Sequence, residues 1–255
     1  MNIALDWLPD AAFAYLVVFA RVGVLLMLMP ALGSSMVPAR LRLSFALLMS
    51  LVLYPLVQPE LPAMPADVLA LAVPLGHELA IGFILGGIVR MVIAATQAAG
   101  ATIAFQTGLS FANSPDPTLG GQQDAVISSF LSVLAVTLVF ATDLHHLALA
   151  AIYDSYKVFP PDAPLMLGDA AKGALMALAD SFRIGVQMAA PFIVFGLVFS
   201  LGLGILSRLM PQLQVYFIAM PASIGLGLAL FALLITMMMG LYLSHFEAQL
   251  SLLRG

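Results

Sequence analysis

The sequence predicts an all-α, polytopic membrane-type protein built from long kinked helices and helical hairpins. Hydrophobic residues make up 62% of the 255 positions and charged residues only 9%, whereas charged residues are about a quarter of an average soluble domain. The mean hydropathy is +1.09. Long apolar runs alternate with segments rich in glycine and proline, which end helices. Each run is therefore a candidate membrane helix or buried helix.

The charge pattern and the cysteine count exclude several classes of protein. The net charge is −4, and the nine Lys and Arg residues are scattered along the chain. There is thus no basic patch for nucleic acid and no polybasic tract for anionic lipid. The chain has no cysteine, so disulfides and thiolate metal sites are absent. Asp6 and Asp10 stand where a signal peptide would be basic, and we expect the N-terminal segment to be retained.

The first apolar run, residues 11–29, contains 19 residues and is long enough to cross about 30 Å of hydrocarbon. Arg21 lies in its middle. An arginine at that depth costs about 2.5–3.5 kcal/mol on insertion scales, so its side chain needs a partner. Two alternatives fit: a buried ion pair within the chain, or a contact with another subunit or a pore.

A turn-rich link, residues 30–38, leads to Arg40 and Arg42 and to an apolar helix that we expect to end near Tyr54. Four prolines then occur within eleven residues, so we expect an extended connector with no helix across it. These prolines are Pro55, Pro59, Pro62 and Pro65.

A second long run follows Asp67, a candidate helix N-cap, and continues to about Thr107. A helix of that length would measure about 60 Å, roughly twice the hydrocarbon core. A single straight membrane span is therefore excluded. The run is either two helices folded back near Gly86 and Gly87, or one long helix that leaves the hydrocarbon region.

The longest polar interruption, residues 106–123, comes next. It contains three glycines and two prolines, so it holds neither a helix nor a central strand. A loop of this length is usually functional or disordered, and the phenylalanines in and beside it argue against disorder. The residues that we single out are Phe105, Gln106, Leu109, Phe111, Asn113, Pro115, Asp116 and Pro117.

After the loop, an apolar run over residues 125–140 is broken by Asp143, His145 and His146 and then resumes. A carboxylate beside two histidines suggests a metal site. On a helix, however, neighbouring residues point about 100° apart, and a two-histidine metal face normally uses positions i and i+4. We therefore expect a polar hairpin between two helices and no metal.

The final third predicts two more long helices, over residues 169–208 and from residue 212 to about 244, the second kinked at Pro221. A tight polar tip joins them, with Arg208, Pro211 and Gln212. Small residues permit close helix approach in membranes. The glycines that offer such surfaces are Gly196, Gly202, Gly204, Gly225 and Gly227.

Charged residues within or between the apolar runs are expected at intramolecular or subunit contacts, because a lone charge is costly there. Glu78 and Arg90 differ by about 120° around a helix and cannot pair locally. The set is Arg21, Glu78, Arg90, Asp143, Asp180 and Arg183. No catalytic motif and no phosphate-binding loop occurs, so we expect neither an enzyme nor a cofactor.

Four groups of residues, taken together and in order, resemble one family. They are Phe19-Ala-Arg21 with Pro30-Ala-Leu-Gly33 and Val37-Pro38-Ala-Arg40-Leu-Arg42; Gln106-Thr-Gly108-Leu-Ser-Phe-Ala with Asp116-Pro117 ahead of Gly121-Gln122; Asp143-Leu-His145-His146 with Asp154-Ser155-Tyr156 and Pro160; and Arg208-Leu-Met-Pro211-Gln212-Leu-Gln214-Val-Tyr216. With them the chain resembles the FliR/SpaR/YscT family of type III secretion export-apparatus membrane proteins. It departs at Asp143-Leu144, where the family often has Asn-Gly, and at Gln214, where Asn is common.

The resemblance implies a structural, gate-forming subunit of the flagellar basal body in the bacterial inner membrane. It implies one FliR-like domain, with a FliP-like portion over about residues 1–165 and a FliQ-like hairpin region over about 166–255. Several copies of FliP and FliQ would complete a helical, pore-containing cone for unfolded flagellar subunits. FlhB, FlhA and membrane lipid are further expected partners, and neighbouring subunits can pair with the charges above.

The leading hypothesis is that residues 106–123 plug the export pore at rest, because a loop rich in glycine and proline can move without breaking helix hydrogen bonds. One alternative is that the loop is a static connector packed against FliP. Another is that the chain is a polytopic small-solute transporter or channel, with Glu78, Arg90 and Asp143 along an internal path.

Overall fold

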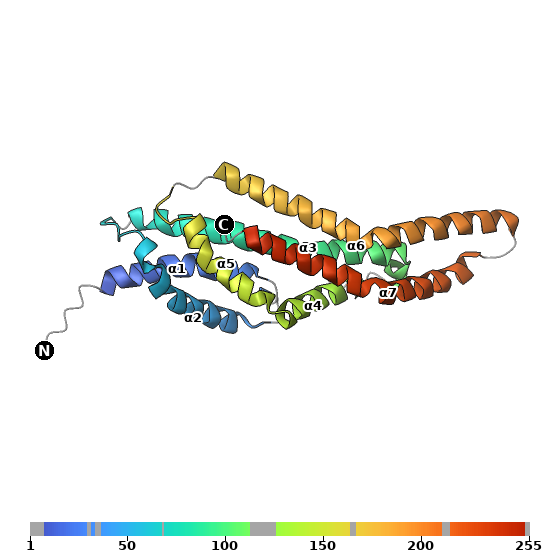
Figure 1. The fold of residues 1–255 in the computed structure, drawn as a ribbon, viewed down its shortest axis with the longest axis horizontal. Coiled ribbons are helices and arrows are strands. Elements are labelled where there is room, and N and C mark those ends of the chain that lie inside the picture. The colour runs from blue at the N-terminus through green and yellow to red at the C-terminus, as the bar shows by residue number, and fades with distance from the viewer. Residues whose placement is uncertain are drawn as a thin grey trace. The chain divides into compact units, whose positions relative to one another are not determined.

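The computed structural model describes residues 8–29, 32–33, 37–67, 69–112, 126–163, 167–210 and 215–252. These residues form α-helices and short 3-10 helices with no strand among them (Figure 1), which confirms the all-α prediction. In chain order the elements are α1 (Leu8–Leu28), α2 (Ala39–Val57), η1 (Gln58–Glu60), η2 (Leu69–Leu71), α3 (Ala72–Gln106), η3 (Leu109–Ala112), α4 (Val126–Ala141), α5 (Leu144–Val158), α6 (Leu167–Leu209) and α7 (Val215–Leu252).

The helices belong to two compact units that interleave along the chain. The first unit comprises Met1–Val92, Phe140–Leu178 and Glu247–Gly255, and the second comprises Ile93–Val139 and Ala179–Phe246. The long helices α3, α6 and α7 each contribute to both units. The expected division near residue 165 follows chain order instead, and it stays a prediction.

In the first unit, α1 packs against both α2 and α3. The Tyr15 hydroxyl donates a hydrogen bond to the Leu47 carbonyl of α2 at 2.9 Å. On the side of α3, the approach of the two backbones requires glycine. A Cβ at Gly82 would lie 2.6 Å from the Arg21 carbonyl oxygen, and one at Gly86 would lie 2.8 Å from Leu28 Cβ. The absence of a side chain at these positions lets the two helices touch.

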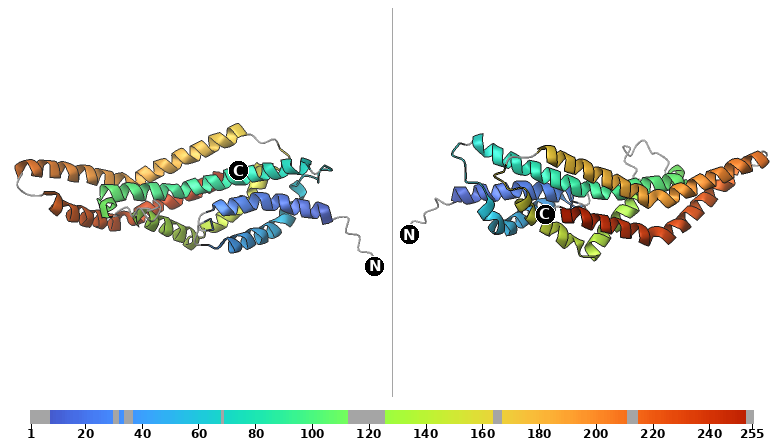
Figure 2. Two further views of the ribbon diagram at one scale, coloured as in Figure 1. Left: turned by 180° about the vertical axis from the view of Figure 1, so that it is seen from behind. Right: turned by 45° about the horizontal axis from the view of Figure 1, so that its top comes forward.

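In the second unit, aromatic contacts join α4, α6 and α7. The Phe231 ring of α7 lies 6.0 Å from Phe130 of α4 and 6.3 Å from Phe192 of α6, measured between ring centroids. The part of α3 from Ile93 onward also belongs to this unit. It contacts α4 where the Ser128 hydroxyl donates to the Gln97 carbonyl at 3.1 Å. Figure 2 shows α6 and α7 of this unit as two arms of a hairpin.

Three expectations about helix boundaries can be compared with the structure. The helix α3 continues without a break through Gly86 and Gly87 for 35 residues, which selects the single long helix over the folded-back pair. The helix α7 ends at Leu252, beyond the expected end near residue 244. The expected polar tip between α6 and α7 includes residues 211–214, which lie outside the described residues.

The expectation that the helix after residue 38 ends before Pro55 was wrong. Pro55 lies inside α2, which ends at Val57 and passes into η1. The missing N–H of Pro55 removes one helical hydrogen bond, and α2 continues for only two more residues. At the end of α2, the Gln58 amide still donates to the Tyr54 carbonyl. The non-helical connector therefore begins at Leu61.

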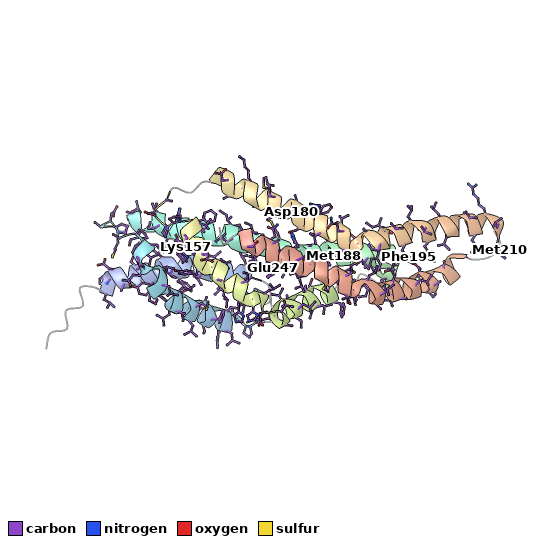
Figure 3. All side chains as sticks on the ribbon, in the orientation of Figure 1. Lys157, Asp180, Met188, Phe195, Met210 and Glu247 are labelled. Atoms are coloured by element: carbon purple, nitrogen blue, oxygen red, sulfur yellow. The ribbon has the colours of Figure 1, made fainter. Side chains whose placement is uncertain are left out.

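Five of the described helices are long and apolar enough to cross a membrane, or six spans result if α4 and α5 form one broken span. The chain is accordingly a membrane protein. In the most apolar windows of α6 and α7, only 17% of the residues are buried within the chain. Exposed apolar side chains of α6 include Val194, Leu197 and Leu201. Met210, one residue past the end of α6 (Figure 3), is 47% exposed. Such a surface needs lipid or another protein to cover it.

The approach of α1 and α3 predicts opposite effects at two glycines of one helix. We expect Gly82→Ala to lower the free energy of unfolding by about 1–3 kcal/mol, because the added Cβ overlaps the Arg21 backbone. Gly87→Ala is the matched control, since nothing lies within 4 Å of its Cβ position. It should raise stability by up to about 1 kcal/mol through helix propensity. Thermal unfolding of the purified chain in detergent measures both, and equal effects would contradict the packing.

Candidate functional site

The charged residue at the centre of α1 forms a bidentate ion pair with α3. Arg21 and Glu78 are both 0% exposed. Arg21 Nε donates to Glu78 Oε2 at 2.6 Å, and Arg21 Nη2 donates to Glu78 Oε1 at 2.9 Å. Two parallel charge-assisted hydrogen bonds of this kind are stronger than bonds between neutral groups. The structure thus shows the intramolecular alternative for Arg21.

The remaining donors of Arg21 reach the end of α5. Nη1 donates to the Ser155 carbonyl at 2.9 Å and to the Ser155 hydroxyl at 3.4 Å, and Nη2 donates to the Phe159 carbonyl at 2.8 Å. The guanidinium carbon lies 3.9 Å from the centroid of the Tyr156 ring, a cation–π distance. All five N–H donors of the guanidinium have acceptors. We call this set of contacts the Arg21 clasp.

The Arg21 clasp joins parts of the chain that are far apart in sequence. Arg21 and Glu78 are 57 positions apart, and Arg21 and Phe159 are 138 apart. A buried charge without its partner is strongly unfavourable, so the pairing allows few other arrangements of α1, α3 and α5. The clasp fixes how these helices align within the first unit.

The other charged residues that the sequence analysis singled out are not drawn into the interior to the same degree. Arg90 and Arg183 are exposed, and the Asp143 side chain is 79% exposed. Asp180 is half-buried and Arg208, in the last turn of α6, is exposed. Their expected role at subunit contacts stays a prediction.

An internal path through Glu78, Arg90 and Asp143 receives no support from these contacts. Glu78 is fully buried and engaged by Arg21, whereas Arg90 and Asp143 lie on the surface of the chain. The three residues do not line a common interior.

The start of the predicted plug loop is structured. Phe105 and Gln106 belong to the last turn of α3, Gly108 then adopts a φ of +80°, and η3 follows. That positive φ is a conformation that favours glycine. The Phe105 side chain is 67% exposed, and Leu109 is half-buried. The other singled-out residues, which are the side chain of Phe111 and the whole of Asn113, Pro115, Asp116 and Pro117, lie outside the described residues.

The base of this loop is held between α6 and α7 in the second unit. The Ser223 hydroxyl of α7 donates to the Thr107 carbonyl at 3.2 Å. Gly227 leaves no room for a Cβ beside the Thr107 side chain, and Gly196 of α6 leaves none beside the Gln106 side chain. The sequence suggested five glycines for close helix approach, and Gly196 and Gly227 do make close contacts. At the other three, Gly202, Gly204 and Gly225, an added Cβ would meet nothing within 4 Å.

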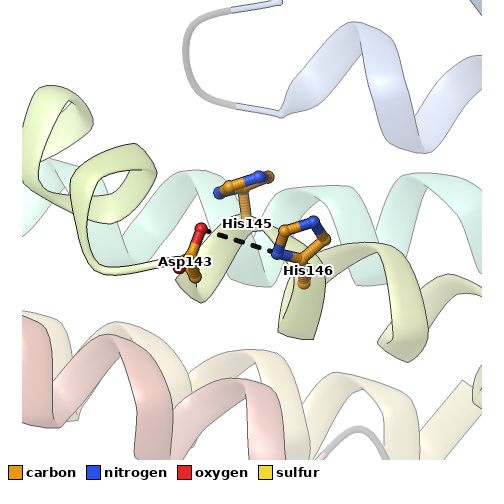
Figure 4. A group of neighbouring side chains, drawn as sticks. All are labelled: Asp143, His145 and His146. Atoms are coloured by element: carbon orange, nitrogen blue, oxygen red, sulfur yellow. Dashed lines mark ion pairs between the residues drawn. The ribbon is translucent and has the colours of Figure 1, made fainter.

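The break between α4 and α5 brings together Asp143, His145 and His146 (Figure 4). One ligand atom from each lies within 4.8 Å of the others. Asp143 has a φ of 59°, so it is not part of either helix, and the two imidazole centroids are only 4.1 Å apart. The helical separation of neighbouring residues, which argued against a metal, therefore does not keep these groups apart.

Comparisons with known proteins identify the family. The family described as "Bacterial export proteins, family 1" matches residues 12–249. The chain is 49% identical to the flagellar biosynthetic protein FliR of Caulobacter vibrioides over 216 residues, which are 85% of this chain and 86% of that protein. The chain belongs to the FliR family of bacterial export proteins.

More distant relatives extend this family relationship. The flagellar biosynthetic protein FliR of Bacillus subtilis is 32% identical over 89% of this chain and 86% of its own. The Yop proteins translocation protein T of Yersinia pestis is 22% identical over 92% of this chain and 90% of its own. The printed names describe flagellar biosynthesis and protein translocation, and none of them names an enzyme.

The Arg21 clasp predicts a non-additive mutational cycle. Arg21→Met or Glu78→Leu alone should lower the free energy of unfolding by about 3–5 kcal/mol, because each leaves a buried charged group without its partner. The double variant Arg21→Met/Glu78→Leu should lose less than the sum of the two single changes. Chemical unfolding of the purified chain in detergent measures the cycle.

The control for that cycle is the exposed pair Lys172–Asp169, whose side chains are 75% and 74% exposed. Lys172→Ala should change stability by less than about 1 kcal/mol. Additive losses in the Arg21–Glu78 cycle would show that the two side chains are not coupled.

Proposed function

We propose that the chain is a structural subunit of the flagellar type III protein export apparatus in the bacterial inner membrane. The observation that carries this proposal is the family match over residues 12–249, together with 49% identity to a flagellar FliR over most of both chains. The relative named for Yop proteins translocation is only 22% identical, so the flagellar relatives are the better match.

The uncovered apolar surface supports a subunit that works within an assembly. Most residues in the apolar windows of α6 and α7 are not buried by the chain itself. A helix longer than the bilayer is thick extends beyond the lipid, so the apolar side chains outside the lipid need another protein to cover them. The lengths of α6 and α7 are 43 and 38 residues. FliP and FliQ, with FlhB and FlhA, are the partners that we propose, and the basal body is the location.

Within that assembly, we propose that residues 106–123 close the export channel at rest. The N-terminal base of the segment, at Gln106 and Thr107, is held against Ser223, Gly196 and Gly227. Phe105 is exposed beside this base and can exclude water and ions, as hydrophobic constrictions do in channels.

Copurification is the test of the assembly. A tagged chain expressed with FliP and FliQ of the same bacterium should retain both through detergent extraction, and a strain lacking the chain should export no filament protein. A chain that purifies alone and supports solute flux in liposomes would instead favour a transporter.

Replacement of the loop tests the plug. Cells whose chain carries residues 110–120 replaced by an equally long Gly/Ser linker should leak ions through the assembled complex, because the linker keeps the connection but lacks apolar groups. Membrane conductance and copurification of FliP and FliQ are measured on the same strains. Normal conductance in a fully assembled complex would leave residues 106–123 as a static connector.

The glycines under the loop base provide a second, more local test of the plug. Gly227→Ala should displace Thr107 and raise ion leakage, since the added Cβ overlaps a short β-branched side chain. Gly225→Ala, on the same helix with nothing within 4 Å of its Cβ position, is the matched control and should leave the channel closed. Equal conductance in the two variants would separate the loop base from gating.

A further inference from the structure

We propose that Asp143, His145 and His146 form a binding site for a divalent cation of the zinc class at the break between α4 and α5. The three side chains offer a carboxylate oxygen and two imidazole nitrogens that lie within 4.8 Å of one another (Figure 4). Two imidazoles and one carboxylate are a ligand set that zinc and its transition-metal neighbours accept, with water in the open positions.

The distances require only small side-chain rotations for binding. Ligand atoms around one tetrahedral zinc lie roughly 3.3 Å apart, given bond lengths of about 2.0–2.2 Å. One of the three pairs, His146 Nδ1 and Asp143 Oδ1, is 3.8 Å apart. These two side chains are 71% and 79% exposed, so neither is held by packing and both can turn toward a cation.

The backbone at the break keeps the carboxylate available. Asp143 occupies the N-cap position of α5, where an aspartate normally accepts a hydrogen bond from the first turn. Here its side chain makes no such bond, because its φ is 59°. The carboxylate oxygen is directed instead at His146 (Figure 4). An ordinary helix cap would leave that oxygen occupied.

The second histidine adds an independent observation. Nδ1 of His145 is buried and has no hydrogen-bond partner in the described part of the chain, although buried polar atoms are normally paired. Its ring lies against Phe140 at 5.0 Å between centroids and against His146 at 4.1 Å. The phenylalanine fixes the His145 ring beside its neighbour, while His145 Nδ1 stays without a hydrogen-bond partner among the described residues.

The helix dipole sets a limit on the affinity. The positive end of α5 points at the cluster and opposes a cation, and the single carboxylate offsets this effect. We therefore expect a reversible site, open to water, that holds the α4–α5 break in one geometry when it is occupied. By mass action, a bound cation stabilises the folded chain.

Zinc titration of the full chain tests this site. The chain is purified in detergent with a tag free of histidine, and Zn²⁺ binding is measured by calorimetry. We expect one saturable site and a zinc-dependent rise in Tm. Asp143→Asn and His146→Gln should each weaken binding at least tenfold, because even the loss of a residue that only orients a metal ligand costs about 10–100-fold in affinity. Asparagine also tolerates a positive φ, so Asp143→Asn keeps the turn.

The controls separate this cluster from other groups. Asp169→Asn removes an exposed carboxylate elsewhere and should bind zinc as the parent does. His77 and His245 remain in every variant, so binding that survives in His145→Gln/His146→Gln would come from other groups and would overturn the proposal. No saturable binding by the parent chain at millimolar Zn²⁺ would overturn it as well. The visible spectrum of bound Co²⁺, lost in the same variants, should show nitrogen and oxygen ligands.

Discussion

A guanidinium charge buried among apolar helices is the constraint on which the first unit depends. Arg21 is 0% exposed, and a charge at such a place is stable only where its hydrogen bonds are all made. Glu78 neutralises it, and the carbonyls of Ser155 and Phe159 take the donors that the carboxylate cannot reach. These groups come from α3 and from the C-terminal end of α5. An otherwise uniform apolar packing thereby gains one preferred register.

The close approach that the clasp requires also explains where small residues are needed. Gly82 lies against the backbone of Arg21 itself, so a side chain there would push α3 away from the residue that Glu78 must reach. In a membrane, helices gain little from hydrophobic association and pack through small residues and hydrogen bonds instead. The second unit follows this rule at Gly196 and Gly227, where the side chains of Gln106 and Thr107 fill the space.

The fold leaves much apolar surface uncovered and also breaks its helices at polar points. The uncovered faces of α6 and α7 suit a chain whose family serves protein export, since neighbouring subunits and lipid can share them. The breaks after α3 and α4, by contrast, carry polar residues. Gly108 and Asp143 both adopt positive φ, and each stands two residues past the end of a helix. The loop base and the Asp143–His145–His146 cluster are thus the places where this apolar chain offers chemistry to other molecules.

The sequence by itself determined the helical class, most helix boundaries and the membrane character, because these follow from hydropathy, proline and glycine positions along the chain. It also showed that Arg21 and Glu78 each needed a partner. That they partner each other was decided only by the tertiary structure, since 57 positions separate them and no local spacing encodes the contact. Pro55 was misjudged because a single proline does not always end a helix, and α2 continues to Val57. The convergence of Asp143, His145 and His146 likewise depends on one positive φ, which composition does not reveal but which decides where each side chain points.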